Sequence, residues 1–110
     1  THPKSKYLWV DFPITNDEKM QRSVCVINKD TLEIEKCWEV ADYGRAVHFE
    51  FNKDGTEVWV SVWGKLDAPQ GQQGEVVVYD AETLEEIARI PDLPTATGKF
   101  NVYNTMNDIY

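Results

Sequence analysis

Histidine is the first residue type in this sequence whose chemistry suggests a function, and it occurs twice, as His2 and His48. An imidazole gains and loses a proton near neutral pH, so His48 is a candidate proton donor or cofactor contact. Histidines in apolar strands are also often core residues bonded to a backbone carbonyl, and the residue type alone favours that interpretation. His2 precedes Pro3 and is expected to belong to a turn.

The two cysteines, Cys25 and Cys37, do not form a metal or haem motif. The sequence has no C-x-x-C, no H-x-x-x-H and no C-x-x-C-H, and it lacks phosphate-binding loops and dinucleotide fingerprints. We therefore expect no metal site and no covalently attached haem in this segment. One strand register would place the two thiols opposite each other as a disulfide, but small buried free thiols are common and are the favoured interpretation.

The segment from Thr95 to Asn101 combines small hydroxyl side chains, Gly98 and Phe100 at the entrance of an expected strand. Such a segment lets backbone and side chains approach a flat ligand closely, although an ordinary junction between a loop and a strand is the favoured interpretation. Most carboxylates fall in expected hairpin turns, which is typical of a solvated edge rather than of an acid and base pair. Examples are Asp30, Glu33, Glu82, Glu85 and Glu86.

The composition describes a folded acidic chain without indicating its activity. The 110 residues contain 11 Lys and Arg against 19 Asp and Glu, a net charge of −8, and 42% of them are hydrophobic. That hydrophobic fraction suffices for a packed core. A strong negative field disfavours nucleic acids and anionic membrane surfaces as partners. The sequence contains no run of about 18 apolar residues, so membrane insertion is not expected.

Short apolar stretches bounded by Gly, Pro, Asn or Asp follow one another along the chain, and no stretch of about 11 residues keeps a helical period. The sequence therefore predicts an all-β fold. The expected strands are Tyr7–Phe12, Ser23–Asn28, Glu33–Val40, Val47–Asn52, Glu57–Trp63, Glu75–Asp80, Glu86–Ile90 and Lys99–Tyr103.

The two halves of the chain resemble each other with a period of about fifty residues, which is typical of β-propeller blades. Residues 6–11 (KYLWVD) match residues 56–61 (TEVWVS), and a second pair of segments matches around a shared Thr-Leu-Glu. In those segments Asn28 and Asp80 occupy equivalent positions. Each is expected to open a hairpin turn, because its short polar side chain can bond the backbone just ahead.

Blade-like repeats at about 2–46 and 47–90 predict two four-stranded blades, and a closing strand at about 97–105 would join a blade begun elsewhere. Because two blades cannot close a ring, the sequence indicates the C-terminal part of a longer propeller protein. The strand nearest a propeller axis begins at the face where central ligands bind, which brings His48 toward such a site. The alternative is a self-contained sandwich built by duplication, since short, evenly spaced strands also suit sandwiches.

Three segments resemble the C-terminal end of cytochrome cd1 nitrite reductases: residues 1–5 (THPKS), 51–63 (FNKDGTEVWVSVW) and 97–105 (TGKFNVYNT). The resemblance covers essentially all of residues 1–110. It implies an eight-bladed propeller that holds non-covalent haem d1 on its axis, in a periplasmic homodimer. It also implies a separate domain with haem c and a small electron-donor protein. Electrons would pass through haem c to haem d1, where nitrite is reduced to nitric oxide and water.

The same resemblance implies roles for individual residues. Thr97 resembles a family contact to haem d1, and Gly98 and Phe100 resemble residues of the wall around it. Arg45 matches a basic position at the mouth of the site, where positive charge suits the carboxylates of haem d1. His48 stands where the family usually has a glutamine against the macrocycle, so it is expected to contact the cofactor or to supply protons to nitrite.

These implications describe a parent enzyme rather than the isolated chain. In the family, the axial histidine of haem d1 and the haem c domain belong to other segments, so the 110 residues alone are expected to be inactive. Two other functions remain open. One is a related propeller that binds haem d1 during its biosynthesis or delivery, which a histidine at position 48 would fit. The other is a non-enzymatic propeller that binds proteins and no tetrapyrrole.

Overall fold

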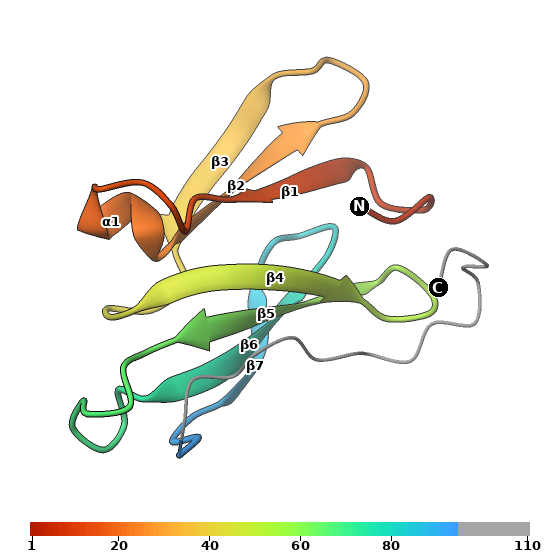
Figure 1. Ribbon diagram of the computed structural model, residues 1–110. Helices are drawn as coiled ribbons and strands as arrows, with labels where there is room; N and C mark the ends of the chain where they lie inside the picture. Colours follow the sequence, from red (N-terminus) through yellow and green to blue (C-terminus); the bar gives the residue numbers. More distant parts are fainter. Residues whose placement is uncertain (95–110) are drawn as a thin grey trace.

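The computed structural model describes residues 1–94, which form two antiparallel β-sheets and one short helix (Figure 1). The first sheet has the order β1-β2-β3 and consists of β1 (Tyr7–Asp11), β2 (Ser23–Asn28) and β3 (Ile34–Glu39). The second sheet has the order β4-β5-β6-β7 and consists of β4 (Arg45–Phe51), β5 (Glu57–Trp63), β6 (Gly74–Asp80) and β7 (Glu86–Ile90). Consecutive strands are neighbours, so each sheet is a simple meander.

The all-β expectation is confirmed, and every strand expected within residues 1–94 is present with bounds within two residues of those expected. The largest difference is at β4, which begins at Arg45 rather than Val47 because its pairing with β5 continues until Arg45 lies opposite Trp63. The expected strand Lys99–Tyr103, and with it the closing strand at 97–105, lies outside the described residues.

The helix α1 (Glu18–Gln21) has no counterpart among the expected elements. Four residues are too few to carry a helical period, so the hydrophobic pattern could not reveal it. The residue that marks the start of this helix is its N-cap, Asp17. Its side chain accepts hydrogen bonds from the backbone N–H groups of Lys19 at 3.0 Å and Met20 at 3.1 Å. Such a side-chain acceptor satisfies the free N–H groups that begin every helix.

The turns after β2 and β6 repeat each other bond for bond, as the sequence repeat predicts. The Asn28 Oδ1 atom accepts the backbone N–H groups two and three residues ahead, at 2.8 and 3.2 Å, and the Asp80 Oδ1 atom does the same at 2.8 Å each. Leu32 and Leu84 occupy equivalent left-handed positions in these turns, with φ of 61° and 66°. The predicted role of both turn-opening side chains is therefore confirmed.

The two sheets pack face to face through an aromatic cluster. Trp9 and Trp38 of the first sheet meet edge to face, with ring centroids 5.3 Å apart, and both lie against Tyr79 of the second sheet at 5.7 and 5.4 Å. Phe49 on β4 lies 6.0 Å from Trp9. Such arrangements add attraction to the burial of large apolar surfaces. The core between the sheets therefore centres on Trp9, which is only 4% exposed.

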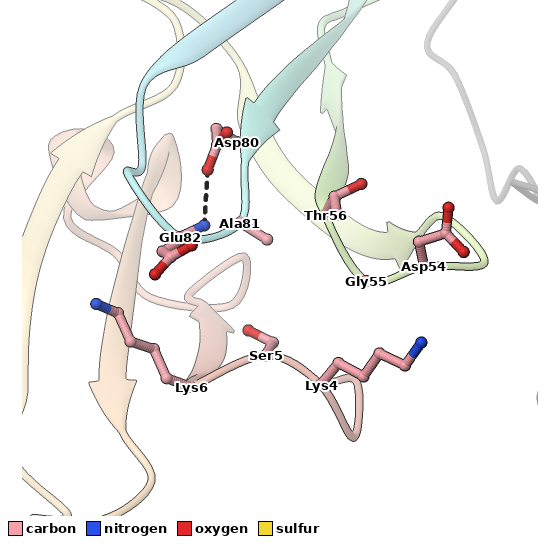
Figure 2. A pocket seen from close by; sticks show the side chains of 9 residues that line it. All are labelled: Lys4, Ser5, Lys6, Asp54, Gly55, Thr56, Asp80, Ala81 and Glu82. Carbon is pink, nitrogen blue, oxygen red and sulfur yellow. Dashed lines mark hydrogen bonds between the residues drawn. The ribbon is translucent and has the colours of Figure 1, made fainter.

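A pocket of about 300 Å³ lies at the end of the sheets where β4 finishes, between the N-terminal turn and the turns that follow β4 and β6 (Figure 2). Its exposed lining carries both signs of charge, with Lys4 and Lys6 on one side and Asp54 and Glu82 on the other. Arg45 and His48, the two predicted cofactor-binding residues within residues 1–94, do not line this pocket.

His2 is a structural residue at this same end. Its Nδ1 atom accepts the Lys4 N–H at 3.1 Å, so the proton is on Nε2, which donates to the Lys53 carbonyl oxygen at 3.1 Å. The ring is 2% exposed and lies against Gly55, where an added Cβ would be 2.4 Å from Nδ1. The expectation that His2 belongs to a turn is confirmed, and the ring joins that turn to the hairpin between β4 and β5.

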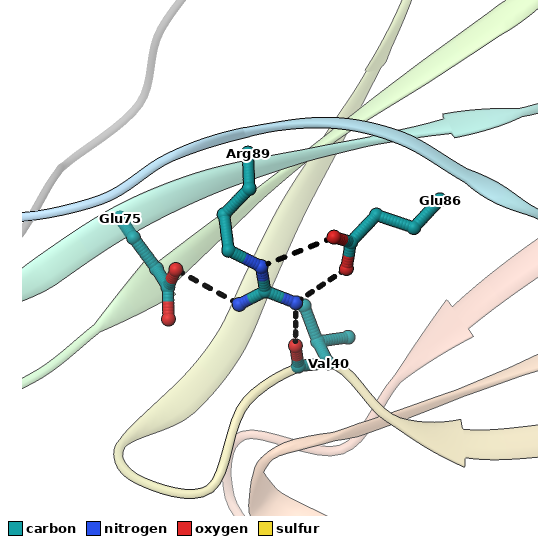
Figure 3. A network of polar contacts seen from close by, with 4 residues as sticks. All are labelled: Val40, Glu75, Glu86 and Arg89. Atoms are coloured by element: carbon teal, nitrogen blue, oxygen red, sulfur yellow. Dashed lines mark hydrogen bonds and ion pairs between the residues drawn. The ribbon is translucent and has the colours of Figure 1, made fainter.

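One arginine of the second sheet forms ion pairs within that sheet and a hydrogen bond to the end of the first sheet (Figure 3). Arg89 on β7 donates to Glu75 at 2.8 Å and to the carbonyl oxygen of Val40 at 2.9 Å, and it also pairs with Glu86. Val40 directly follows the first sheet, so one guanidinium bridges both sheets. The hydrogen bond to Glu86 and then that to Glu75 raise the pKa of Arg89, which keeps it charged.

Replacing Arg89 by alanine is expected to lower the free energy of unfolding by about 2–3 kcal/mol, because it leaves the Glu75 carboxylate and the Val40 carbonyl without their donor. Glu75 is only 7% exposed, so water cannot replace the lost partner easily. Arg22→Ala is the matched control, because it removes the solvent-accessible pair with Glu39 and should cost less than about 1 kcal/mol. Equal losses in urea unfolding would contradict the bridging role of Arg89.

Cys25 and Cys37 form a disulfide between β2 and β3, so the interpretation of the two residues as free thiols is wrong. The pairing of the strands explains the result. Cys25 lies directly opposite Cys37, and their Cα atoms are 4.1 Å apart. The bond fastens β3, whose side chains are mostly exposed, to the buried strand β2.

Candidate functional site at the edge of the second sheet

Arg45, His48 and Trp63 lie together at one edge of the second sheet. β4, which carries the first two, is the outermost strand of its sheet among the described residues and pairs only with β5. Arg45 lies opposite Trp63 in that pairing, and the His48 ring meets the Trp63 indole edge to face with centroids 5.5 Å apart. The structure therefore places Arg45 and His48, two of the residues predicted to bind the cofactor, each beside Trp63.

A β-bulge in β4 turns His48 out of the sheet. The pairing of β4 with β5 shifts between Val47 and Phe49, and His48 has a left-handed φ of 67°. Its backbone N–H donates to the Asp11 Oδ2 atom at 3.0 Å, and its side chain is exposed. The interpretation of His48 as a core histidine is therefore wrong, because the extra residue of the bulge projects outward instead of following the alternation of the strand.

A pocket of about 650 Å³ opens at the end of the second sheet where β4 begins, and Arg45 and Trp63 contribute to its lining. Gly44 has a φ of +70°, and an added Cβ would lie 2.3 Å from the Trp63 carbonyl oxygen, so the loop before β4 needs glycine to pass this closely. Burial and then the negative charge of Glu75 raise the pKa of Tyr43, which also lines the pocket. The phenol therefore stays protonated.

Three polar groups at this edge have no partner within residues 1–94. The Arg45 guanidinium forms no ion pair, the ring nitrogens of His48 form no hydrogen bond, and the indole N–H of Trp63 is buried without an acceptor. Of the three, only the Trp63 donor is buried, and a buried donor without an acceptor is costly, whereas Arg45 and His48 are exposed and available to a ligand. This edge therefore suits a ligand that brings acceptor atoms. A flat macrocycle that carries carboxylates has acceptors for the cation and the N–H groups, together with a face for the aromatic rings. The residues present fit haem d1.

The remaining predicted site residues, Thr97, Gly98 and Phe100, lie outside the described residues. Sequence reasoning missed two residues of the site, Trp63 and Asp11. The sequence could have pointed to Trp63, because it ends a strand expected to pair with the strand of His48. Nothing in the sequence points to Asp11, because its contact with His48 joins two sheets across 37 residues of sequence.

Two negative findings apply to the described part of the chain. Residues 1–94 contain no group of three or more His, Cys, Asp or Glu side chains arranged to hold a metal ion. They also contain no helix with the length and apolar character needed to cross a bilayer.

Comparison with known proteins gives concordant results. The chain is 40% identical over its whole length to a nitrite reductase of Stutzerimonas stutzeri, of which it covers 21%. It is 36% identical over 94% of its length to a dihydro-heme d1 dehydrogenase of Pseudomonas aeruginosa, of which it covers 19%. The chain thus spans about a fifth of the length of these relatives.

Among solved structures, the dihydro-heme d1 dehydrogenase NirN in complex with DHE matches 93% of the chain with a TM-score of 0.73 and 34% sequence identity, and the chain covers 20% of it. This similarity agrees with the expected fold class, in which antiparallel sheets are the blades of part of a β-propeller. Residues 1–105 match the family model described as "Cytochrome D1 heme domain". The chain therefore belongs to the cytochrome D1 heme domain family.

Proposed function

We propose that this chain forms part of the wall of a haem d1 site in a nitrite reductase that produces nitric oxide. The observation that carries the proposal is the cluster of Arg45 and His48 on the edge strand β4 with Trp63 at the end of the neighbouring strand β5, where all three present polar groups without partners among residues 1–94. The nitrite reductase of S. stutzeri, 40% identical to the chain, supports this choice of reaction.

Each of the three side chains has a definite task in this proposal. When bound, haem d1 supplies the redox-active iron at which nitrite is reduced. Arg45 binds a carboxylate of the macrocycle, and its planar guanidinium can do so with two hydrogen bonds. Trp63 packs against the ring of His48 and limits its orientation. The reduction of nitrite to nitric oxide and water consumes two protons for each electron, and His48 can hold one of them at a ring nitrogen.

The blade division predicted at about 2–46 and 47–90 is part of the proposal. Trp9 and Trp59 are equivalent in the sequence repeat, but Trp9 is buried against the second sheet whereas Trp59 is half-buried among the described residues. A further blade packed against the second sheet would cover Trp59 as the second sheet covers Trp9. This equivalence supports a further blade packed against the second sheet; the proposed ring has eight blades, completed by other segments and closed by a strand at about 97–105.

The remaining parts of the parent enzyme follow from the same proposal. A separate domain holds haem c, a small protein donates electrons to it, and the parent is a homodimer in the periplasm. The Cys25–Cys37 disulfide supports this compartment, because disulfides persist in oxidising environments such as the periplasm. The isolated chain is inactive, since the iron ligand and haem c belong to other segments.

A second candidate function is a dehydrogenase or delivery protein that handles haem d1 during its biosynthesis. The 36% identical dihydro-heme d1 dehydrogenase and the similarity to the NirN structure favour it. The exposed imidazole of His48 suits it as well, since removal of a hydrogen from a bound macrocycle also requires a proton acceptor. A protein-binding scaffold without tetrapyrrole remains the third candidate.

The visible spectrum of the intact protein that contains this chain distinguishes the three candidates. Bands of both haem c and haem d1, with production of nitric oxide from nitrite, support the reductase. Conversion of dihydro-haem d1 to haem d1, without nitrite reduction, supports the dehydrogenase. A protein that stays colourless when haem d1 is added would leave only the scaffold.

Replacing His48 by alanine is expected to slow nitrite turnover by about 10²-fold or more, which is typical of the loss of a positioned proton donor. His48→Gln is the informative companion, because it keeps a polar side chain but cannot carry a proton at neutral pH. We expect the glutamine variant, which carries the side chain usual at this position in the family, to keep the haem d1 spectrum, and its rate compared with that of the alanine variant separates the polar contact from the proton. Unchanged kinetics and spectra in both variants would remove His48 from the site.

A further inference from the structure

We propose that Asp11 is a positioning residue that holds His48 in its outward-facing bulge and so presents the imidazole to the haem d1 site; this inference rests on the function proposed above. Asp11 belongs to β1 of the first sheet, whereas His48 belongs to β4 of the second. The hydrogen bond from the His48 N–H to the Asp11 Oδ2 atom, at 3.0 Å, therefore couples the site to the neighbouring sheet.

The backbone at His48 needs such an anchor. Its φ of 67° is in the left-handed region, which is unfavourable for a residue with a side chain and persists where the surroundings enforce it. The bulge also removes the residue from the regular pairing with β5, since the register passes from Val47 directly to Phe49. The His48 N–H therefore needs an acceptor other than β5, and Asp11 provides one.

The surroundings of Asp11 indicate that this bond is its principal role. Within residues 1–94 the carboxylate accepts no other hydrogen bond and pairs with no cation. The side chain is half-buried at the end of β1, on the face that packs against the second sheet with Trp9. A carboxylate partly removed from water without a cation is unfavourable unless a donor compensates it, and the His48 N–H is that donor.

Losing this anchor should change where the imidazole points. The contact of the His48 ring with Trp63, at 5.5 Å between centroids, exists because the bulge directs residue 48 outward beside the end of β5. Without the carboxylate, the left-handed conformation loses the bond that offsets its cost, and other conformations of residue 48 become populated. Asp11 thereby acts on the cofactor site through His48 and without touching the cofactor.

Hydrogen exchange of the His48 amide in the intact, cofactor-free protein tests the anchor directly. In Asp11→Ala we expect exchange at this amide to accelerate about tenfold or more, because its acceptor is lost. Asp11→Asn should restore slow exchange, since the amide oxygen of asparagine still accepts the bond. Asp80→Ala is the matched control: it also removes a carboxylate that accepts backbone N–H groups, but in the distant turn after β6. Unchanged exchange at His48 in Asp11→Ala would overturn the proposal.

The haem d1 spectrum and affinity of the loaded protein test whether the anchor serves the site. Asp11→Ala should alter both in the same direction as His48→Ala, and Asp11→Ala should add nothing on a His48→Ala background. Fully additive effects would overturn the positioning role. If the unaltered protein bound no haem d1, the function proposed above would fail instead, because the exchange experiment requires no cofactor.

Discussion

Replacing Trp9 by alanine is expected to lower the free energy of unfolding by about 3–5 kcal/mol, the largest stability change in this fold. Trp9 is 4% exposed and contacts aromatic rings from both sheets, with Trp38 at 5.3 Å, Tyr79 at 5.7 Å and Phe49 at 6.0 Å between centroids. The truncation leaves a cavity that the paired strands on both sides cannot close. The result should be a lower urea midpoint with an unchanged slope.

The matched control for Trp9→Ala is Leu66→Ala, another truncation of a large apolar side chain. Leu66 is exposed in the loop between β5 and β6, so its loss should change stability by less than about 0.5 kcal/mol. Leu66 is not part of the buried core cluster, so the stability change of Leu66→Ala measures the effect of losing exposed apolar surface alone. Equal stability of the two variants would show that the interface between the sheets does not centre on Trp9.

Replacing Arg45 by glutamate is expected to weaken haem d1 binding by about 10- to 100-fold, the largest effect on affinity in the proposed site. Arg45 forms no ion pair within residues 1–94, so it is available to a carboxylate of the ligand. In a chain of net charge −8, each cation beside an anionic cofactor matters, and a glutamate there adds repulsion to the lost attraction. Titration of the cofactor-free intact protein with haem d1, followed by visible absorption, measures the change.

Lys53→Glu makes the same change of net charge at the opposite end of the second sheet, in the turn after β4. It should leave the haem d1 affinity within about twofold of the unaltered protein, because solvent screens charges more than about 10 Å apart. The haem d1 affinity of Arg45→Lys should lie between those of Arg45→Glu and the unaltered protein, since an ammonium keeps the charge but loses the planar pair of donors. An affinity loss in Lys53→Glu as large as that in Arg45→Glu would assign the effect to net charge instead of to the site.

The strands and turns of both sheets could be predicted from the sequence, because each depends on residues that are close together in the chain. The equivalence of Asn28 and Asp80 predicted two turns whose hydrogen bonds match. The disulfide was harder to predict. Cys25 and Cys37 flank the first of these turns, but a regular hairpin would place Cys25 opposite Lys36, and the register shift between Val26 and Ile27 is what brings Cys37 opposite Cys25. The sequence offered that register as one possibility, and the commonness of free buried cysteines outweighed it.

The site was only partly predictable, because its geometry depends on contacts between sheets. The bulge that turns His48 outward has no local sign, since the left-handed residue is a histidine and not a glycine. The Asp11 carboxylate that accepts the His48 N–H belongs to another sheet, and no pattern within one strand reveals it. Arg45 was named through a family resemblance alone, and the structure adds the reason for its availability, which is the absence of an ion pair within residues 1–94.

A crystal structure of the intact protein with haem d1 bound would show directly whether the edge strand β4 forms part of the cofactor wall. We expect the Arg45 guanidinium within hydrogen-bond distance of a macrocycle carboxylate, about 3 Å, and the His48 ring in contact with the macrocycle or with bound nitrite. A macrocycle bound elsewhere, with Arg45 and His48 facing solvent, would contradict this expectation.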